Sequence, residues 1–232
     1  MIVVKIADIP VGIDNRYKYI EGLARDYLTD ESAAFTVSVD DCEIARERED
    51  SDEPHSDGYL EGVVAYRKIA ERLPEYGAVV FHGAVICLGG RAYAFTAKSG
   101  VGKTTHTRLW IRSVEGSYYL NGDKPIIRLV DGHPRAYGTP WRGKEGYGVN
   151  ESAPLASIAL IERAEHNSAR PIDKGEGVVR FVKQIYIPKD PAQAVKAMRV
   201  ADGIISSVRL VELKCNMDPE AADVASRAMI VD

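Results

Sequence analysis

The 232-residue sequence has no long apolar run, and no stretch approaches the roughly 20 consecutive apolar residues that are needed to cross a bilayer. Residues 1–8 contain only a short apolar run that ends in charge. A secretory signal peptide would have a longer apolar segment and a small-residue cleavage site. We therefore expect neither secretion nor membrane insertion, and residues 2–6 are predicted to form a strand.

Cysteines are few and scattered. Cys42, Cys87 and Cys215 lie far apart, form no CxxC pair and have no histidine nearby at the spacing of a metal site. Such isolated thiols suit a reducing compartment, so a cytoplasmic location is expected.

The sequence also lacks an excess of basic charge. Its 30 basic and 34 acidic side chains give a formal net charge of −4, which argues against a sequence-independent nucleic-acid binder. Hydrophobic residues make up 45% of the chain, as is usual for a globular protein and unlike a disordered one. The length suits one α/β domain, or a nucleotide-binding domain with a small N-terminal lobe.

Hydrophobic periodicity and turn residues predict alternating strands and helices. The Gly89-Gly90 and Asp131-Gly132 pairs predict tight hairpin turns, and Pro74 ends a helix. The charged segment 43–57 is interpreted as a solvated loop or a frayed helix. Strands are expected at 2–6, 34–39, 78–88, 91–96, 117–120, 126–130, 135–137, 155–161 and 209–215, and helices at 16–27, 59–73, 104–114, 176–185, 191–207 and 219–229.

Residues 97–105 read Ala-Lys-Ser-Gly-Val-Gly-Lys-Thr-Thr, which is typical of a phosphate-binding loop between a strand and a helix. Gly100 and Gly102 allow backbone N–H groups to surround a phosphate, Lys103 reaches the β- and γ-phosphates, and the Thr104 hydroxyl ligates Mg²⁺. The strict pattern has glycine at position 97, and Ala97 is tolerable if it ends a strand with negative φ. The loop predicts binding of a nucleoside triphosphate, with Mg-ATP preferred.

Two polar residues near the loop are candidates for chemistry. Asp123 lies 20 residues after Lys103, at the end of the next strand, where a doubly wound arrangement brings strand ends to the ligand; it is a predicted metal ligand or, alternatively, a turn cap. His82 interrupts an apolar strand and is either functional or a buried structural histidine. His106, one turn into the helix after the loop, either packs or approaches phosphate.

The glycine-rich segment 138–150 carries charge and a tryptophan that looks exposed, as ligand-contacting loops often do. Arg142 and Lys144 could hold phosphate oxygens, and Glu145 could bind metal. The alternative is a structural turn with a solvated Lys-Glu pair. The predicted nucleotide-binding residues are therefore Ser99, Gly100, Val101, Gly102, Lys103, Thr104, Thr105 and Lys144, and the predicted metal ligands are Thr104, Asp123 and Glu145.

Several motifs, taken in order, resemble those of one enzyme family. They are Phe-His-Gly at 81–83, the Gly-Gly hairpin, the loop at 96–105 and Asn-Gly-Asp-Lys-Pro at 121–125. Together they resemble the catalytic domain of HPr kinase/phosphorylase, which has the phosphoenolpyruvate carboxykinase-like fold. A group of small HPr-kinase-related proteins is similar at 82–84, 99–106, 138–144 and 215–218. The resemblance covers about residues 58–232.

The resemblance implies a mixed α/β sheet with a P-loop at 58–232. The residues before it, 1–57, are predicted from their own pattern to form a small N-terminal α/β lobe with a charged loop. It also implies that His82 lies near the phosphates. The family's paired aspartates fall on Gly122 and Asp123, so that Asp123 acts as both base and metal neighbour, or Glu145 or His82 helps, or catalysis has changed. Residues 1–57 do not match the N-terminal domain of HPr kinase, so HPr itself is not implied as the acceptor.

From the residues and the resemblance we expect an ATP- and Mg²⁺-dependent kinase with Asp123, His82 and Lys103 as catalytic residues. The acceptor would be a hydroxyl on a small molecule or on a peptide or protein serine. An ATP-binding regulatory module with little turnover, and a phosphorylase that runs the reverse transfer, are the alternatives. Neither a nucleic acid nor a membrane is expected as a partner, and a homo-oligomer is compatible with the sequence.

Overall fold

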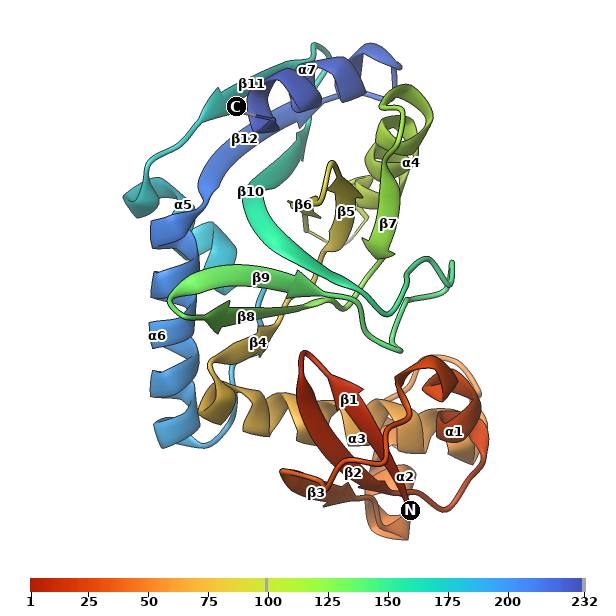
Figure 1. The fold of residues 1–232 in the computed structure, drawn as a ribbon. Coiled ribbons are helices and arrows are strands. Elements are labelled where there is room, and N and C mark those ends of the chain that lie inside the picture. The colour runs from red at the N-terminus through yellow and green to blue at the C-terminus, as the bar shows by residue number, and fades with distance from the viewer. Residues whose placement is uncertain (99, 231–232) are drawn as a thin grey trace.

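The structure is a computed structural model that describes residues 1–98 and 100–230. The described residues form a mixed α/β fold with a small N-terminal sheet, β1-β2-β3, and a larger mixed sheet built by the rest of the chain (Figure 1). The strands are β1 Ile2–Ile6, β2 Ile9–Asp14, β3 Phe35–Ser38, β4 Ala78–Val80, β5 Ala84–Leu88, β6 Arg91–Thr96, β7 Tyr118–Asn121, β8 Ile126–Val130, β9 His133–Tyr137, β10 Ser152–Arg163, β11 Ser168–Pro171 and β12 Arg209–Cys215. The helices are α1 Tyr19–Leu23, α2 Asp41–Glu49, α3 Asp57–Arg72, α4 Lys103–Ser113, α5 Lys174–Val182, α6 Pro191–Ser207 and α7 Glu220–Met229, with short 3₁₀ helices at Arg25–Tyr27 and Leu73–Tyr76.

The large sheet curls around its longest strand, β10. The strand order is β4-β8-β9-β10-β6-β5-β7, and β12 and β11 extend the sheet from a second part of β10. The start of β10 is antiparallel to β9, whereas its later residues are parallel to both β6 and β12. A single strand therefore joins an antiparallel part of the sheet to a mixed part, and the loop at 97–102 follows from the mixed part.

Helices cover both faces of the mixed part. Along β5, Val85 and Cys87 face one core while Ile86 faces another, as the period of two in a strand requires. The core containing Ile86 also includes Trp110 of α4 and alanines of α7, and the other core includes Phe181 of α5 and the apolar side of α6. The sheet thus packs α4 against one of its faces through the core that contains Ile86.

The small N-terminal sheet packs on α3. Side chains of β1 and β2 form one buried cluster with Leu60, Val64 and Ile69 of α3, and the cluster continues to Val80 of β4. The buried Glu61 carboxylate accepts hydrogen bonds from the backbone N–H groups of Arg16 and Tyr17, at 2.7 and 3.1 Å. These contacts tie the segment before α1 to α3. The division of the chain at residues 57 and 58 remains a prediction.

Most predicted elements are confirmed, including both hairpin turns, where Gly89, Gly90, Asp131 and Gly132 all have positive φ. The predicted single strand at 78–88 is wrong, because the chain breaks into β4 and β5. A Cβ at Gly83 would lie 2.2 Å from the Phe81 ring, so this tight packing bends the chain between the strands.

The predicted helix at 16–27 is also wrong in its extent. Only Tyr19–Leu23 is α-helical, because the backbone at 16–17 is held by Glu61 instead of by a helical turn. Strands β2 and β11 were not predicted. The charged segment begins with a well-formed helix, α2, whose capping box joins Asp40 and Glu43.

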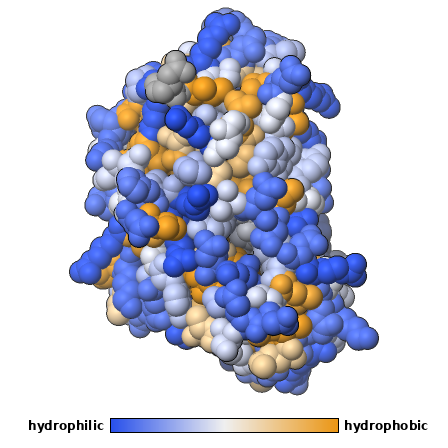
Figure 2. All heavy atoms as spheres, in the orientation of Figure 1, coloured by the Kyte–Doolittle hydropathy of each residue, from blue (hydrophilic) through white to orange (hydrophobic). Residues whose placement is uncertain are grey.

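The molecular face seen in Figure 2 is mostly hydrophilic, and its hydrophobic residues lie in separate groups. Among the residues that the structure describes, no helix combines the length and the apolar character that a membrane span requires.

Candidate functional site

Three segments bring polar side chains to one edge of the large sheet. Strands β6 and β7 are both antiparallel to β5, which lies between them, so the carboxyl ends of β6 and β7 meet the amino end of β5. His82 precedes β5, Lys103 follows β6 after the loop, and Asp123 follows β7. The predicted doubly wound arrangement is wrong, because the middle strand is antiparallel. The strand ends nevertheless converge as that prediction required.

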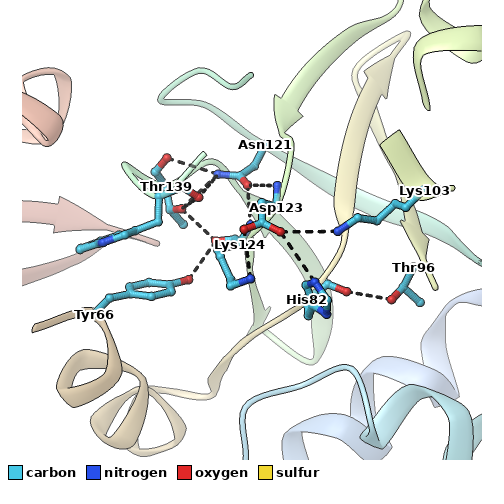
Figure 3. Close-up of polar contacts among 9 residues, drawn as sticks. Tyr66, His82, Thr96, Lys103, Asn121, Asp123, Lys124 and Thr139 are labelled. Atoms are coloured by element: carbon cyan, nitrogen blue, oxygen red, sulfur yellow. Dashed lines mark hydrogen bonds and ion pairs between the residues drawn. The ribbon is translucent and has the colours of Figure 1, made fainter. Parts of the chain in front are cut away.

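Asp123 lies at the centre of a charged cluster (Figure 3). Its Oδ1 is 3.6 Å from Lys103 Nζ and 3.7 Å from His82 Nε2, and its Oδ2 is 3.0 Å from Lys124 Nζ. The structure therefore brings together the three predicted catalytic residues. Lys124 was not predicted, and its position next to Asp123 in the sequence was the available signal.

Hydrogen bonds from the backbone of the turn that carries Asp123 to the buried side chain of Asn121 hold this turn in place. Asn121 Oδ1 accepts hydrogen bonds from the backbone N–H groups of Asp123 and Lys124, at 2.9 and 2.8 Å. Its Nδ2 donates to Thr139 Oγ1 at 3.0 Å, and both residues are fully buried. The amide therefore fixes the backbone of the turn from which the Asp123 side chain extends.

Gly122, where the resemblance implies a second aspartate, has little room for a side chain. A Cβ there would lie 3.3 Å from both Arg142 O and Tyr147 Cβ, and Gly122 N donates to Tyr147 O at 2.9 Å. The segment 142–147 thus packs directly on this glycine. At this position the site offers one carboxylate, that of Asp123.

The cluster sets the protonation states of its members. Burial alone raises the pKa of the Asp123 carboxyl, but the charges of Lys124, Lys103 and His82 outweigh it and leave the pKa below its usual value. Burial lowers the pKa of His82, and the two lysines lower it further, so neutral imidazole is favoured. Burial also lowers the pKa of Lys103, although Asp123 opposes this effect.

The described residues of the loop at 97–102 include two glycines with positive φ. Gly100 and Gly102 have φ of +76° and +114°, and the buried Ala97 directly follows β6 without positive φ. Helix α4 begins at Lys103, and its N-cap residue, Gly102, has no side chain that could cap the N–H groups of the first turn. An uncapped helix start of this kind can accept an anion. Ser99 lies outside the described residues.

Arg163, at the end of β10, holds the loop from one side and was missed by sequence reasoning. Its Nε donates to Val101 O at 2.8 Å, and a second guanidinium nitrogen contacts Gly100 O. The pairing spans 62 residues of sequence, and no motif marks it.

Of the remaining predicted residues, Thr104 is half-buried in the first turn of α4 and Thr105 is exposed.

His106 is a buried residue of α4. Its Nδ1 lies 3.8 Å from Cys215 Sγ, its ring packs against Phe95, and its Nε2 is buried without a hydrogen-bond partner. Burial lowers the pKa of His106 to about 4. The packing role is favoured over a phosphate contact.

The segment 138–150 divides between two surroundings. Trp141 is half-buried instead of exposed, because its ring stacks on Tyr66 at a centroid distance of 4.2 Å. Lys144 and Asp123 both line a cavity of about 590 Å³. Glu145 is exposed and pairs with Arg108 of α4, and its predicted metal role remains a prediction.

The donor set near Asp123 fits magnesium carried by a nucleotide. Mg²⁺ beside phosphates takes one or two carboxylates, and phosphate oxygens and water complete its shell. Asp123 offers one carboxylate, and Thr104 offers a hydroxyl in the first turn of α4. Within residues 1–98 and 100–230, no three His, Cys, Asp or Glu side chains gather as a metal-binding group. The residues suit a metal held mainly by phosphates and not by a protein cage.

No protein-family model matches this chain, and no curated protein matches it. Among solved structures, the Hpr(Ser) kinase/phosphatase from Coxiella burnetii aligns over 64% of this chain and 94% of its own, with 8% identity and a TM-score of 0.36. This similarity is too distant to support a conclusion about the site.

Proposed function

We propose that this chain is an ATP-dependent kinase that binds Mg-ATP at residues 97–105 and transfers the γ-phosphoryl group to a hydroxyl next to Asp123. One observation carries the proposal. The ammonium of Lys103, at the uncapped start of α4, lies 3.6 Å from the Asp123 carboxylate. A phosphate-binding group and a carboxylate able to accept a proton are therefore adjacent, which phosphoryl transfer to a hydroxyl requires.

ATP binding would depend first on backbone groups of α4 and then on side chains. The first N–H groups of α4 and the positive end of the helix dipole attract the phosphates, and Lys103 adds a charge-assisted contact. Thr104 and Asp123 would hold Mg²⁺, which when bound neutralises phosphate charge. Arg163 would keep the loop in its binding conformation by its contacts with Gly100 O and Val101 O.

Transfer would then follow from the position of Asp123. The acceptor oxygen attacks the γ-phosphorus, the bond from that phosphorus to the ADP oxygen breaks, and the hydroxyl proton passes to the Asp123 carboxylate. The lowered pKa keeps this carboxyl ionised and ready to accept the proton. His82, neutral and 3.7 Å from Asp123, would orient the acceptor or a phosphate oxygen by hydrogen bonding.

A second candidate is an ATP-binding module with little turnover. Gly122 favours it, because the packing of 142–147 leaves only one carboxylate in the turn after β7. Both candidates require ATP binding, and they differ in whether Asp123 acts as a base.

Calorimetric titration of Mg-ATP and steady-state ADP release with a panel of hydroxyl acceptors test the proposal. Lys103→Ala is expected to weaken ATP binding by about 10- to 150-fold, the value of a lost charge-assisted hydrogen bond. Arg112→Ala removes a positive charge from the far end of the same helix and serves as the control. An unchanged ATP affinity in Lys103→Ala would rule out both candidates.

Asp123→Asn separates the two candidates. If Asp123 is the base, ATP binding should change only a few-fold while turnover falls by about 10²- to 10⁴-fold. If no acceptor raises ADP release in the wild-type protein although ATP binds tightly, the kinase proposal fails and the binding module stands.

A further inference from the structure

The cavity that contains Asp123 lies between the N-terminal elements and the large sheet. Its volume is about 590 Å³, within the usual range for sites that enclose small organic molecules. Four segments bound it: α1, α3, the turn after β7 and residues 141–144. A substrate in this cavity would reach Asp123 from the side of the N-terminal lobe.

Aromatic rings form much of its wall, and hydrogen bonds fix two of them. Trp141 stacks on Tyr66 with ring planes 23° apart, and its Nε1 donates to Gly62 O at 3.2 Å. The Tyr66 hydroxyl donates to Lys124 O at 2.9 Å. Tyr19 and Tyr59 make an edge-on pair, also in the lining. Rings held this way present a preformed surface to a flat apolar group.

Positive charge exceeds negative charge in the same lining. Asp123 is the one acidic residue there, against Lys124, Arg142 and Lys144. Lys124 pairs with Asp123, and Arg142 pairs with Asp26 at 3.3 Å while its buried Nε has no partner. Lys144 makes no ion pair with any residue in the described part of the chain. A cation without a partner beside apolar walls suits a ligand that carries an acid group.

We infer that the acceptor is a small hydroxy acid with an aromatic or similarly flat body, its ring against the aromatic wall and its acid group on Lys144. This inference rests on the proposed kinase function for the role of the hydroxyl, which would point at Asp123. It selects the small molecule over the peptide or protein serine. The walls and the cation lie within one cavity, so a single compact ligand satisfies both.

Binding of 3-phenyllactate to the full chain without nucleotide tests the inference, with fluorescence of Trp141 as the readout. The other tryptophan, Trp110, is fully buried in a different core. Two probes each lack one feature: 3-phenylpropane-1,2-diol lacks the acid, and lactate lacks the ring. We expect 3-phenyllactate to bind at least tenfold more tightly than either.

Substitutions in the lining assign the two contacts. Lys144→Ala should weaken 3-phenyllactate binding about tenfold and leave the diol unaffected, whereas Tyr59→Ala should weaken the diol and leave lactate unaffected. Lys196→Ala, a charge removed from α6, is the matched control. Equal binding of the three probes, or 3-phenyllactate binding that is unchanged in Lys144→Ala, would overturn the inference, as would phosphorylation of a serine peptide in preference to every hydroxy acid.

The two proposals fail in different ways. The titration with 3-phenyllactate contains no ATP. If 3-phenyllactate binds selectively but the ATP affinity is unchanged in Lys103→Ala, only the kinase proposal is contradicted. Conversely, Lys103-dependent ATP binding without selective binding of 3-phenyllactate would contradict the aromatic hydroxy acid alone.

Discussion

Gly143 approaches Asp123 so closely that one methyl group at this position should displace the carboxylate. A Cβ on Gly143 would lie 2.8 Å from Asp123 Cβ, whereas carbon atoms in contact normally sit about 3.5–4.0 Å apart. Asp123 must therefore retreat by about 0.7–1.2 Å in Gly143→Ala. A misplacement of about 1 Å can cost on the order of 10²-fold in rate, so under the proposed kinase function we expect ADP release to fall by about that factor.

Backbone strain must be separated from this displacement. Gly143 has φ of +74°, where alanine costs about 1–2 kcal/mol. Gly146 in the same segment has φ of +69°, but a Cβ there would meet no atom within 4 Å. Gly146→Ala therefore carries the strain without the clash with Asp123.

The two variants are compared by thermal denaturation and by steady-state ADP release. Both should lose stability through the backbone strain, Gly143→Ala the more because of its additional clash, and only Gly143→Ala should lose most of the turnover of the proposed kinase. Equal turnover in the two alanine variants would refute the reasoning that links the position of Asp123 to the rate.

Three further predictions concern residues around the site. His106 has a pKa of about 4 when folded and about 6.5 when unfolded, so the unfolded state binds more protons between these values and the protein loses stability as the pH is lowered. Acidification from neutral pH to pH 4 should cost about 3 kcal/mol through this residue, and urea unfolding of His106→Gln should show a correspondingly smaller loss. Arg163→Ala frees Gly100 O and Val101 O, and should weaken ATP binding measured by calorimetry with little change in melting temperature. Glu61→Ala leaves two backbone N–H groups without their acceptor and should lower the free energy of unfolding by about 1–3 kcal/mol, measured by urea denaturation.

Local sequence patterns predicted those parts of the fold that depend on residues adjacent in the sequence. The Gly89-Gly90 turn, the ends of α6 and the strand-loop-helix order around residue 100 follow from short-range preferences of glycine, proline and apolar side chains. The split between β4 and β5 could not be predicted this way. It depends on Gly83 packing against Phe81 and on pairing of β4 with β8, far along the chain.

In the candidate site, too, some features follow from neighbouring residues in the sequence and others depend on the tertiary structure. The sequence by itself determined the loop at 97–105, because its two glycines with positive φ and the lysine that starts α4 act through consecutive backbone positions. Only the tertiary structure decided what faces that loop. The antiparallel β5 brings His82 and Asp123 to Lys103, and the packing of 142–147 leaves little room for a side chain at Gly122. The distances between His82, Asp123 and Lys103 are set by the pairing of strands that are distant in the sequence, so they cannot be predicted from the identity of the side chains alone.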